Sequence, residues 1–122
     1  MSNRTPLDIV NEYYDYVWTG KDVERIRSLC VSPMLRHDPG GDIQLTHDQQ
    51  IERINTALKK ELQYKFALQY GNDELVTLVW QAVSKSNPGL HLAGIQVVRV
   101  KDGRMVEVWN ATKPELWLPH QA

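Results

Sequence analysis

Two amide side chains, Gln96 and Asn110, interrupt faces of predicted strands that are otherwise apolar. The apolar neighbours on those faces are Leu92, Gly94, Val98 and Val100 for Gln96, and Val106 and Val108 for Asn110. Buried amides need hydrogen-bond partners. Each amide is therefore either part of a structural network or a group that orients a substrate, and the two could face one cavity.

Tyr13 and Tyr14 are adjacent on the apolar stripe of the first predicted helix. A tyrosine in such a place is usually a core residue whose hydroxyl finds a partner. A buried hydroxyl aimed into a pocket is also what the stabilisation of an oxyanion requires. Tyr13 is therefore a candidate catalytic residue, and Tyr14 competes for that role or binds substrate.

His37 and Asp38 directly precede the turn sequence Pro39-Gly40-Gly41. Asp38 either caps this turn or, in an apolar pocket, acts as a general base, because desolvation makes a carboxylate more basic. His37 is either a histidine at the rim of a turn or a group that shares a proton with a substrate. In an extended segment the two side chains point to opposite sides, so both line a pocket only if the turn bends the chain.

Phe66, Trp80 and Trp109 belong to predicted strands. Aromatic side chains there, and Tyr64 with them, are most often core or interface residues. The family resemblance given below implies that sheet aromatics also wall a ligand cavity, which makes Phe66, Trp80 and Trp109 candidate substrate-binding residues. The histidines at positions 37, 47, 91 and 120 show no ligand spacing of a metal site, and no metal is expected. Cys30 is expected in the core rather than as a nucleophile.

The first half of the chain predicts three helices. The first begins at Thr5-Pro6, where an N-cap and a first-turn proline precede an acid at the third helical position, and it ends at Thr19-Gly20. The second covers about residues 23–30 and is stopped by Pro33. Residues 35–45 are expected to form a loop or a short edge strand. Thr46 and Gln49 form a capping box for the third helix.

The second half changes its apolar period from 3.6 to 2, which marks strands with one buried face. We predict strands over residues 64–70, 74–86, 90–101 and 104–112. One face is expected to carry Tyr64, Phe66, Leu68 and Tyr70 in the first of these strands, and Val106, Val108 and Asn110 in the last, which leaves Met105, Glu107 and Trp109 opposite. Together the elements predict an α+β domain, in which three N-terminal helices pack on a strongly curved antiparallel sheet that encloses a pocket.

The composition restricts the classes of function. A chain of 122 residues suits one domain over residues 1–122, with 1–5 and 113–122 as terminal tails. A net charge of −1 without a basic cluster argues against nucleic-acid binding. No segment approaches about 18 consecutive apolar residues, so no membrane partner is expected. With a single cysteine and no apolar leader, the expected location is cytoplasmic.

Two segments carry a resemblance to a known family. The run from Leu35 to Gly41 ahead of a capped helix, and the segment from Gly94 to Asn110, resemble the SnoaL-like and ketosteroid-isomerase-like branch of the nuclear transport factor 2-like superfamily. The resemblance implies a cone-like sheet around a pocket for a small apolar molecule and chemistry without a cofactor. It also implies a homodimer that pairs across the outer face of the sheet.

The resemblance also implies roles for single residues. Asp38, in Asp38-Pro39, occupies the place of the general base, and Tyr13 matches the oxyanion-binding tyrosine. Gln96 falls where ketosteroid isomerases place a second, acidic oxyanion donor, and Asn110 where cyclases place a terminal acid. The leading hypothesis is an isomerase, cyclase or dehydratase type of enzyme that moves protons on an apolar, cyclic carbonyl compound. The alternative is a non-catalytic binding or dimerisation module of the same fold.

Overall fold

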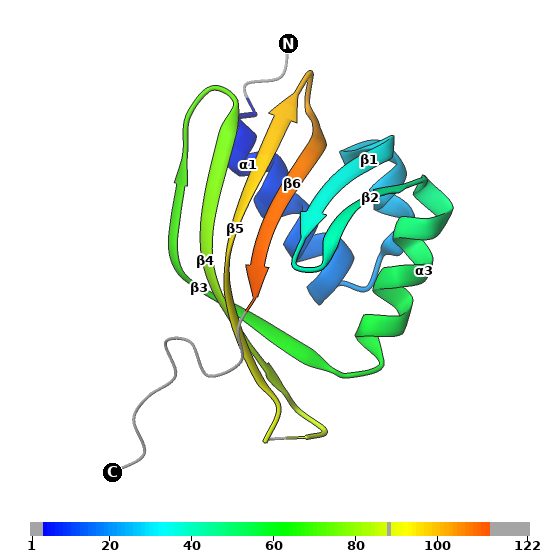
Figure 1. Ribbon diagram of the computed structural model, residues 1–122, viewed down its shortest axis with the longest axis vertical. Helices are drawn as coiled ribbons and strands as arrows, with labels where there is room; N and C mark the ends of the chain where they lie inside the picture. The colour runs from blue at the N-terminus through cyan, green and yellow to red at the C-terminus, as the bar shows by residue number, and fades with distance from the viewer. Residues whose placement is uncertain (1–3, 88, 113–122) are drawn as a thin grey trace.

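A curved six-stranded sheet forms one layer of the structure, and the helices form the other (Figure 1). This computed structural model describes residues 4–87 and 89–112, so the predicted tail 113–122 and residues 1–3 of the other tail lie outside the described residues. Helix α1 crosses behind the sheet, and α3 lies beside strand β2. The predicted α+β architecture is confirmed.

The sheet is antiparallel apart from one parallel pair. The helical elements are α1 (Pro6–Glu12), the π-helix η1 (Tyr13–Thr19), the 3-10 turn η2 (Val23–Arg25), α2 (Ile26–Leu29) and α3 (His47–Leu58). The strands are β1 (Cys30–Asp38), β2 (Gly41–Leu45), β3 (Leu62–Gly71), β4 (Leu75–Ser84), β5 (His91–Lys101) and β6 (Arg104–Thr112). Their order is β2-β1-β6-β5-β4-β3, and β1 runs parallel to β6.

Two capping boxes begin helices where the sequence predicts them. The Thr5 side chain accepts a hydrogen bond from the Asp8 amide while Asp8 accepts one from the Thr5 amide, and Thr46 and Gln49 make the same exchange. Each box satisfies two of the amides that a helix N-terminus leaves without an intrahelical acceptor. These local signals therefore set the start of α1 and α3.

The first helix changes from α to π geometry at Tyr13. In the wider winding, the Gly20 amide donates to the Asp15 carbonyl at 2.9 Å, five residues back. A π-helix has more residues in each turn than an α-helix, so Tyr13 and Trp18, five residues apart, lie closer to the same side of the helix. The predicted end at Thr19-Gly20 is observed, but the π winding was not predicted.

The prediction of a loop or a short edge strand at residues 35–45 is only partly right, because Gly41–Leu45 forms an edge strand while residues 35–38 belong to an interior strand. Residues 30–38 form β1, which lies between β2 and β6, and Gly41–Leu45 returns as β2 after a two-residue turn. Pro33 lies inside β1 rather than after a helix. Pairing between β1 and β6 is interrupted between Cys30 and Leu35, which accommodates a residue without an amide hydrogen.

Two bulges also correct the predicted strand faces. The register of β3 shifts between Phe66 and Leu68, so Leu68 and Tyr70 are turned outward, 58% and 66% exposed. The register between β5 and β6 shifts next to Val106, which places Met105 in the core at 1% exposure. A bulge adds one residue to one strand and so exchanges the two faces beyond it.

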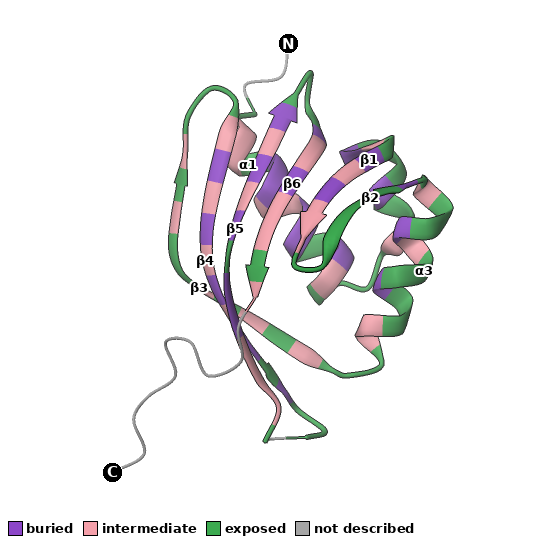
Figure 2. Ribbon diagram, in the orientation of Figure 1, coloured by how far each residue is buried: buried purple, intermediate pink, exposed green. Residues whose placement is uncertain are grey.

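The core lies between the inner face of the sheet and helices α1, η1 and α2. Along β4, buried residues alternate with half-buried ones, and Figure 2 shows the resulting bands. Side chains that alternate along a strand point to opposite faces. The fold therefore has a closed inner face and an outer face that the helices leave uncovered.

We expect Gly94→Ala to destabilise the fold, because a Cβ there would lie 2.6 Å from the Ala111 carbonyl oxygen and 2.7 Å from the Trp80 ring. Overpacking of this kind costs about 1–3 kcal/mol, which urea unfolding can measure. Gly89→Ala is the control, since the nearest contact of its Cβ is Asn87 Oδ1 at 3.6 Å. An unfolding free energy of Gly94→Ala equal to that of the wild type would contradict this packing.

Candidate functional site

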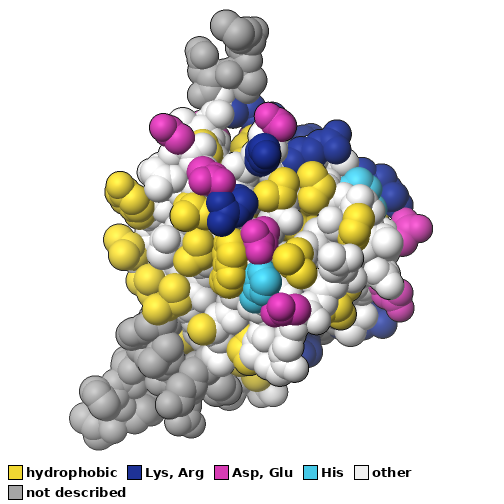
Figure 3. Space-filling model, turned by 45° about the horizontal axis from the view of Figure 1, so that its top comes forward, with side chains coloured by type: hydrophobic (Ala, Val, Ile, Leu, Met, Phe, Trp, Pro, Cys, Tyr) yellow, Lys and Arg dark blue, Asp and Glu magenta, His cyan; other side chains and the backbone are white. Residues whose placement is uncertain are grey.

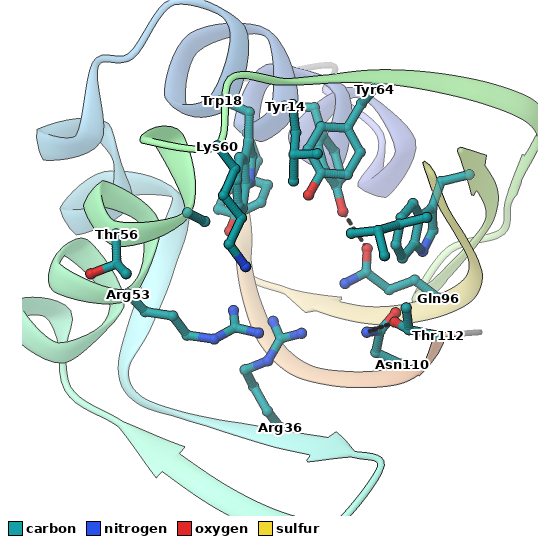
Figure 4. A pocket seen from close by; sticks show the side chains of 15 residues that line it. Tyr14, Trp18, Arg36, Arg53, Thr56, Lys60, Tyr64, Gln96, Asn110 and Thr112 are labelled. Carbon is teal, nitrogen blue, oxygen red and sulfur yellow. Dashed lines mark hydrogen bonds between the residues drawn. The ribbon is translucent and has the colours of Figure 1, made fainter. Parts of the chain in front are cut away.

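A cavity of about 330 Å³ opens between η1, α3 and the inner face of the sheet (Figure 4). This volume lies within the usual range of small-molecule sites, about 300–1,000 Å³. Its lining is Tyr13, Tyr14, Trp18, Arg36, Arg53, Thr56, Ala57, Lys60, Leu62, Tyr64, Trp80, Leu92, Gln96, Asn110 and Thr112. The lining has an aromatic part, an amide part and a cationic part.

The aromatic part joins the helix to the sheet. The Tyr64 ring lies 5.1 Å from Trp18, 5.6 Å from Trp80 and 5.6 Å from Tyr14, measured between centroids. The ring planes are tilted or perpendicular to one another, as edge-to-face packing favours. These rings provide an apolar wall against which a flat or cyclic ligand can pack.

The amide part is built by two neighbouring strands. Gln96 on β5 and Asn110 on β6 are register partners and both line the cavity. The Tyr14 hydroxyl donates to Gln96 Oε1 at 2.5 Å, which leaves the amide nitrogen of Gln96 turned toward the cavity (Figure 4). Asn110 Nδ2 donates to Thr112 Oγ1 at 2.9 Å, and Asn110 Oδ1 is buried with no partner among the described residues.

The cationic part consists of Arg36 on β1, Arg53 on α3 and Lys60 just after α3. Arg36 is 5% exposed, and its Nε and Nη2 each donate to an oxygen of Asp38 at 3.1 Å. Arg53 lies 3.9 Å from the same carboxylate. Burial and the neighbouring Arg36 lower the pKa of Arg53. Burial also acts to lower the pKa of Arg36, but the hydrogen bonds to Asp38 and the nearby Tyr13 and Tyr14 together raise it.

Burial keeps the tyrosine hydroxyls of the cavity protonated. It raises the pKa of Tyr13 and of Tyr64 to about 12, and that of Tyr14 well above its usual value. Removal from water disfavours a phenolate. Near neutral pH these hydroxyls therefore act as neutral hydrogen-bond donors or acceptors and not as bases.

The structure separates His37 from Asp38. Asp38 is on the inner side with Arg36, next to the cavity but not among its lining residues. His37 is on the outer side, where its Nε2 lies 2.6 Å from Glu107 and its Nδ1 2.8 Å from Asp42. Hydrogen bonding to Glu107, and then to Asp42, raises the pKa of His37. The turn after Asp38 does not bring both side chains into one pocket.

Of the three aromatic candidates on the strands, one lines the cavity, one lies on the outer face of the sheet and one packs against Tyr14. Trp80 lines the cavity. Trp109 stacks on His37 on the outer face, with centroids 5.1 Å apart, and Phe66 packs against Tyr14 at 4.9 Å without lining the cavity. Trp109 is one residue before Asn110, so the alternation of the strand turns it outward.

The sequence analysis did not identify the cations, or Trp18, as residues of the cavity. Arg53, Thr56, Ala57 and Lys60 line the cavity together. Their spacing of three and four residues is that of one helix face, and it is a signal that the sequence does contain. Arg36 stands two residues before Asp38, which in a strand means the same face. Trp18 and Tyr64 join the cavity through the π winding and the strand β3.

Within residues 4–87 and 89–112, no group of three or more His, Cys, Asp or Glu side chains could hold a metal ion. Cys30 is buried in the core, and burial raises the pKa of its thiol to about 12. Within these residues, no helix has the length and apolar character needed to cross a membrane.

Comparison with protein-family models decides the family. The model of the SnoaL-like domain matches residues 10–108. The chain belongs to the SnoaL-like family. This places it in the SnoaL-like branch of the nuclear transport factor 2-like superfamily. A search of curated proteins finds no significant match.

Solved structures of low sequence identity share the SnoaL-like fold. A protein of Kribbella flavida is 19% identical, with a TM-score of 0.76 over 92% of this chain and 88% of that one. A proposed polyketide cyclase of Acidithiobacillus ferrooxidans is 18% identical, with a TM-score of 0.71 over 92% and 91% of the two chains. IdmH of Streptomyces antibioticus, also a proposed polyketide cyclase, is 18% identical, with a TM-score of 0.70 over 89% and 92%.

The raised pKa of Tyr13 predicts a loss of stability in alkali. The folded pKa of about 12 exceeds the unfolded value of 10.0, so this stabilisation is complete below pH 10 and is lost as pH rises through 12. The unfolded state releases the proton first, which lowers the unfolding free energy by about 1.4 kcal/mol per pH unit in that window.

Urea unfolding between pH 9 and pH 12 tests this contribution. Tyr13→Phe should lose less stability over the window than the wild type, by about 2–3 kcal/mol. Tyr16→Phe, at a position 43% exposed on the same helix, is the control and should follow the wild type. Identical slopes for Tyr13→Phe and the wild type would show that the hydroxyl is not buried as described.

Proposed function

We propose that the cavity binds a small, largely apolar cyclic carbonyl compound and catalyses a proton transfer on it, as an isomerase, cyclase or dehydratase does. The observation that carries the proposal is that neutral donors, an aromatic wall and Arg36 line one cavity, with Asp38 hydrogen-bonded to Arg36 beside it. The polyketide-cyclase names of two solved structures of the same fold support the enzymatic interpretation over a passive module.

Gln96 and Tyr13 are the proposed donors to the carbonyl oxygen. The amide nitrogen of Gln96 faces the cavity while its oxygen accepts from Tyr14, and this acceptance polarises the amide toward donation. Tyr13 stays protonated because burial raises its pKa to about 12. Fixed donors aimed at a developing oxyanion stabilise the transition state without reorganisation.

Asp38 is the proposed general base. No Asp or Glu lines the cavity among the described residues, and Asp38 is the carboxylate beside it, because it contacts two lining residues, Arg36 and Arg53. Each carboxylate oxygen has two acceptor positions, so the hydrogen bonds from Arg36 leave capacity to take a proton. In the proposed step, Asp38 removes a proton from the carbon beside the carbonyl and returns it at another position.

Hydrogen–deuterium exchange tests the base without knowledge of the natural substrate. NMR would follow the loss of protons next to the carbonyl of cyclic ketones such as tetralones in D₂O. We expect Asp38→Asn to slow the catalysed exchange by about 10²–10⁴-fold, the usual contribution of a general base. Tryptophan fluorescence follows ligand binding in the same variant, because Trp18 and Trp80 line the cavity. Retained binding with slowed exchange would assign the loss to the base, and not to a collapse of the site around Arg36.

Asp42→Asn is the matched control for this experiment. Asp42 belongs to the same hairpin, but its side chain is 66% exposed and pairs with His37 on the outer face. Its exchange rate should equal that of the wild type. Exchange at the wild-type rate in Asp38→Asn would refute the proposed base. Saturable binding without any exchange in the wild type would favour the binding module.

We also propose that two copies pair across the outer face of the sheet. Leu68, Tyr70 and Ile95 are 58%, 66% and 40% exposed there, and Figure 3 shows hydrophobic side chains beside a row of acidic and basic ones. The charges in that row already pair within the chain, since Arg99 contacts Glu74 and Glu107, and Glu107 contacts His37. A second copy would therefore cover the apolar side chains without leaving these charges unpaired.

Sedimentation velocity tests the dimer. The wild type should sediment as a dimer at tens of micromolar, and Ile95→Lys as a monomer, because a lysine would be buried without a partner. Ile43→Lys is the control. Ile43 is 48% exposed, but it is the cross-strand partner of Arg36 and so lies on the inner face of the sheet, away from the proposed interface. A monomeric wild type at high concentration would overturn the pairing.

A further inference from the structure

We propose that the compound bound in the cavity carries a carboxylate, held by Arg53 and Lys60 beside the Arg36–Asp38 pair. The inference rests on the proposed function because it takes the same cavity as the substrate site. It goes further by naming the charge of the substrate and the residues that select it.

The charges around the cavity do not balance. Its lining contains Arg36, Arg53 and Lys60, and among the described residues the only carboxylate within 4.0 Å of any of them is Asp38. Both carboxylate oxygens of Asp38 accept hydrogen bonds from Arg36. One carboxylate against three cations leaves two positive charges in excess at a partly enclosed site.

Two other arginines of the chain lie closer to a carboxylate than Arg53 does. Arg25 lies 3.2 Å from Asp22, and Arg27 lies 2.7 Å from Asp48, although both pairs are on the surface. The only ion pair of Arg53 among the described residues is the long one to Asp38, at 3.9 Å. Burial and Arg36 together lower the pKa of Arg53. An anion placed between the guanidinium groups of Arg36 and Arg53 would offset both the burial of Arg53 and its repulsion by Arg36.

The side chains are arranged to receive such an anion. In Figure 4 the ends of Arg36 and Arg53 lie side by side, and the Lys60 ammonium points from α3's end toward the same space. A guanidinium binds the two oxygens of a carboxylate through parallel hydrogen bonds. The aromatic wall of Trp18, Tyr64 and Trp80 lines the same cavity, so a ring with one carboxylate substituent matches both parts of the lining.

The excess of positive charge is also compatible with the proposed chemistry. When Asp38 removes a proton, its negative charge passes to the carbonyl oxygen of the substrate, so the net charge of the site does not change. With one carboxylate on the substrate, three cations face two negative charges both before and after the transfer. A single carboxylate therefore does not exhaust the positive charge of the site at either stage.

Isothermal titration calorimetry with a matched pair of probes tests the inference. The probes are 2-naphthoate and 2-naphthamide, which share a ring and differ in charge, with 2-naphthyl phosphate as a third. At low salt we expect the wild type to bind the naphthoate at least tenfold more tightly than the amide. Arg53→Gln and Lys60→Gln should each remove most of this preference, because each weakens the binding of the naphthoate more than the binding of the amide.

Lys59→Gln is the matched control, because it makes the same change in net charge at an exposed neighbour that does not line the cavity. It should keep the wild-type preference. Equal affinities of the wild type for naphthoate and naphthamide would overturn the inference and leave the cavity as the binding site. Tighter binding of the naphthyl phosphate than of the naphthoate would overturn the assignment to a carboxylate.

The two proposals can fail separately. No binding of any probe would overturn the cavity as the ligand site, and with it the proposed function. A preference for naphthoate that depends on Arg53 and Lys60, in a protein that exchanges no protons of carbonyl compounds, would support the anion site and refute the catalytic proposal.

Discussion

The ion pair between Arg36 and Asp38 constrains the part of the fold that builds the site. Arg36 is almost wholly buried, and a buried guanidinium without a counter-ion costs several kcal/mol. Asp38 meets this need only if the two residues lie on the same face, which requires an extended chain between them. The turn must therefore come after Asp38, and the sequence Pro39-Gly40-Gly41 provides it, with φ of +101° at Gly40 and +137° at Gly41.

The same pair organises the cavity around it. It fixes one guanidinium beside the cavity and draws Arg53 of α3 toward the same carboxylate. The hairpin that carries it also sends His37 to the opposite side, where the ring stacks on Trp109. Alternation along one strand thus assigns Arg36 and Asp38 to the candidate chemistry inside the sheet, and His37 to the surface proposed for pairing.

Much of the fold could be predicted because its signals are local. Thr5 with Asp8, and Thr46 with Gln49, specify helix starts within four residues, and the change of period after the third helix indicates the meander of strands. Gln96 and Asn110 could be recognised as unusual because each interrupts an apolar face. Their meeting at one cavity follows from the register of β5 and β6, which depends on contacts distant in the sequence.

The remaining features depend on tertiary structure. The bulges beside Phe66 and Val106 exchange strand faces, and no residue type there announces an extra residue. Pro33 indicated a helix stop, but β1 accepts it where pairing with β6 is interrupted. The cationic part of the cavity could not be predicted, because Arg36 and Lys60 come from elements far apart in the chain and each alone resembles an ordinary surface charge.

Our proposals place a ring against the aromatic wall of one cavity and an anion at its cations. A crystal structure of the protein with 2-naphthoate would show whether the cavity binds a ligand in this way. We expect the naphthalene beside Trp18 and Trp80, and the carboxylate within hydrogen-bond distance of Arg53 and Lys60. A naphthoate bound elsewhere, or in the cavity with its carboxylate directed away from these cations, would refute this arrangement.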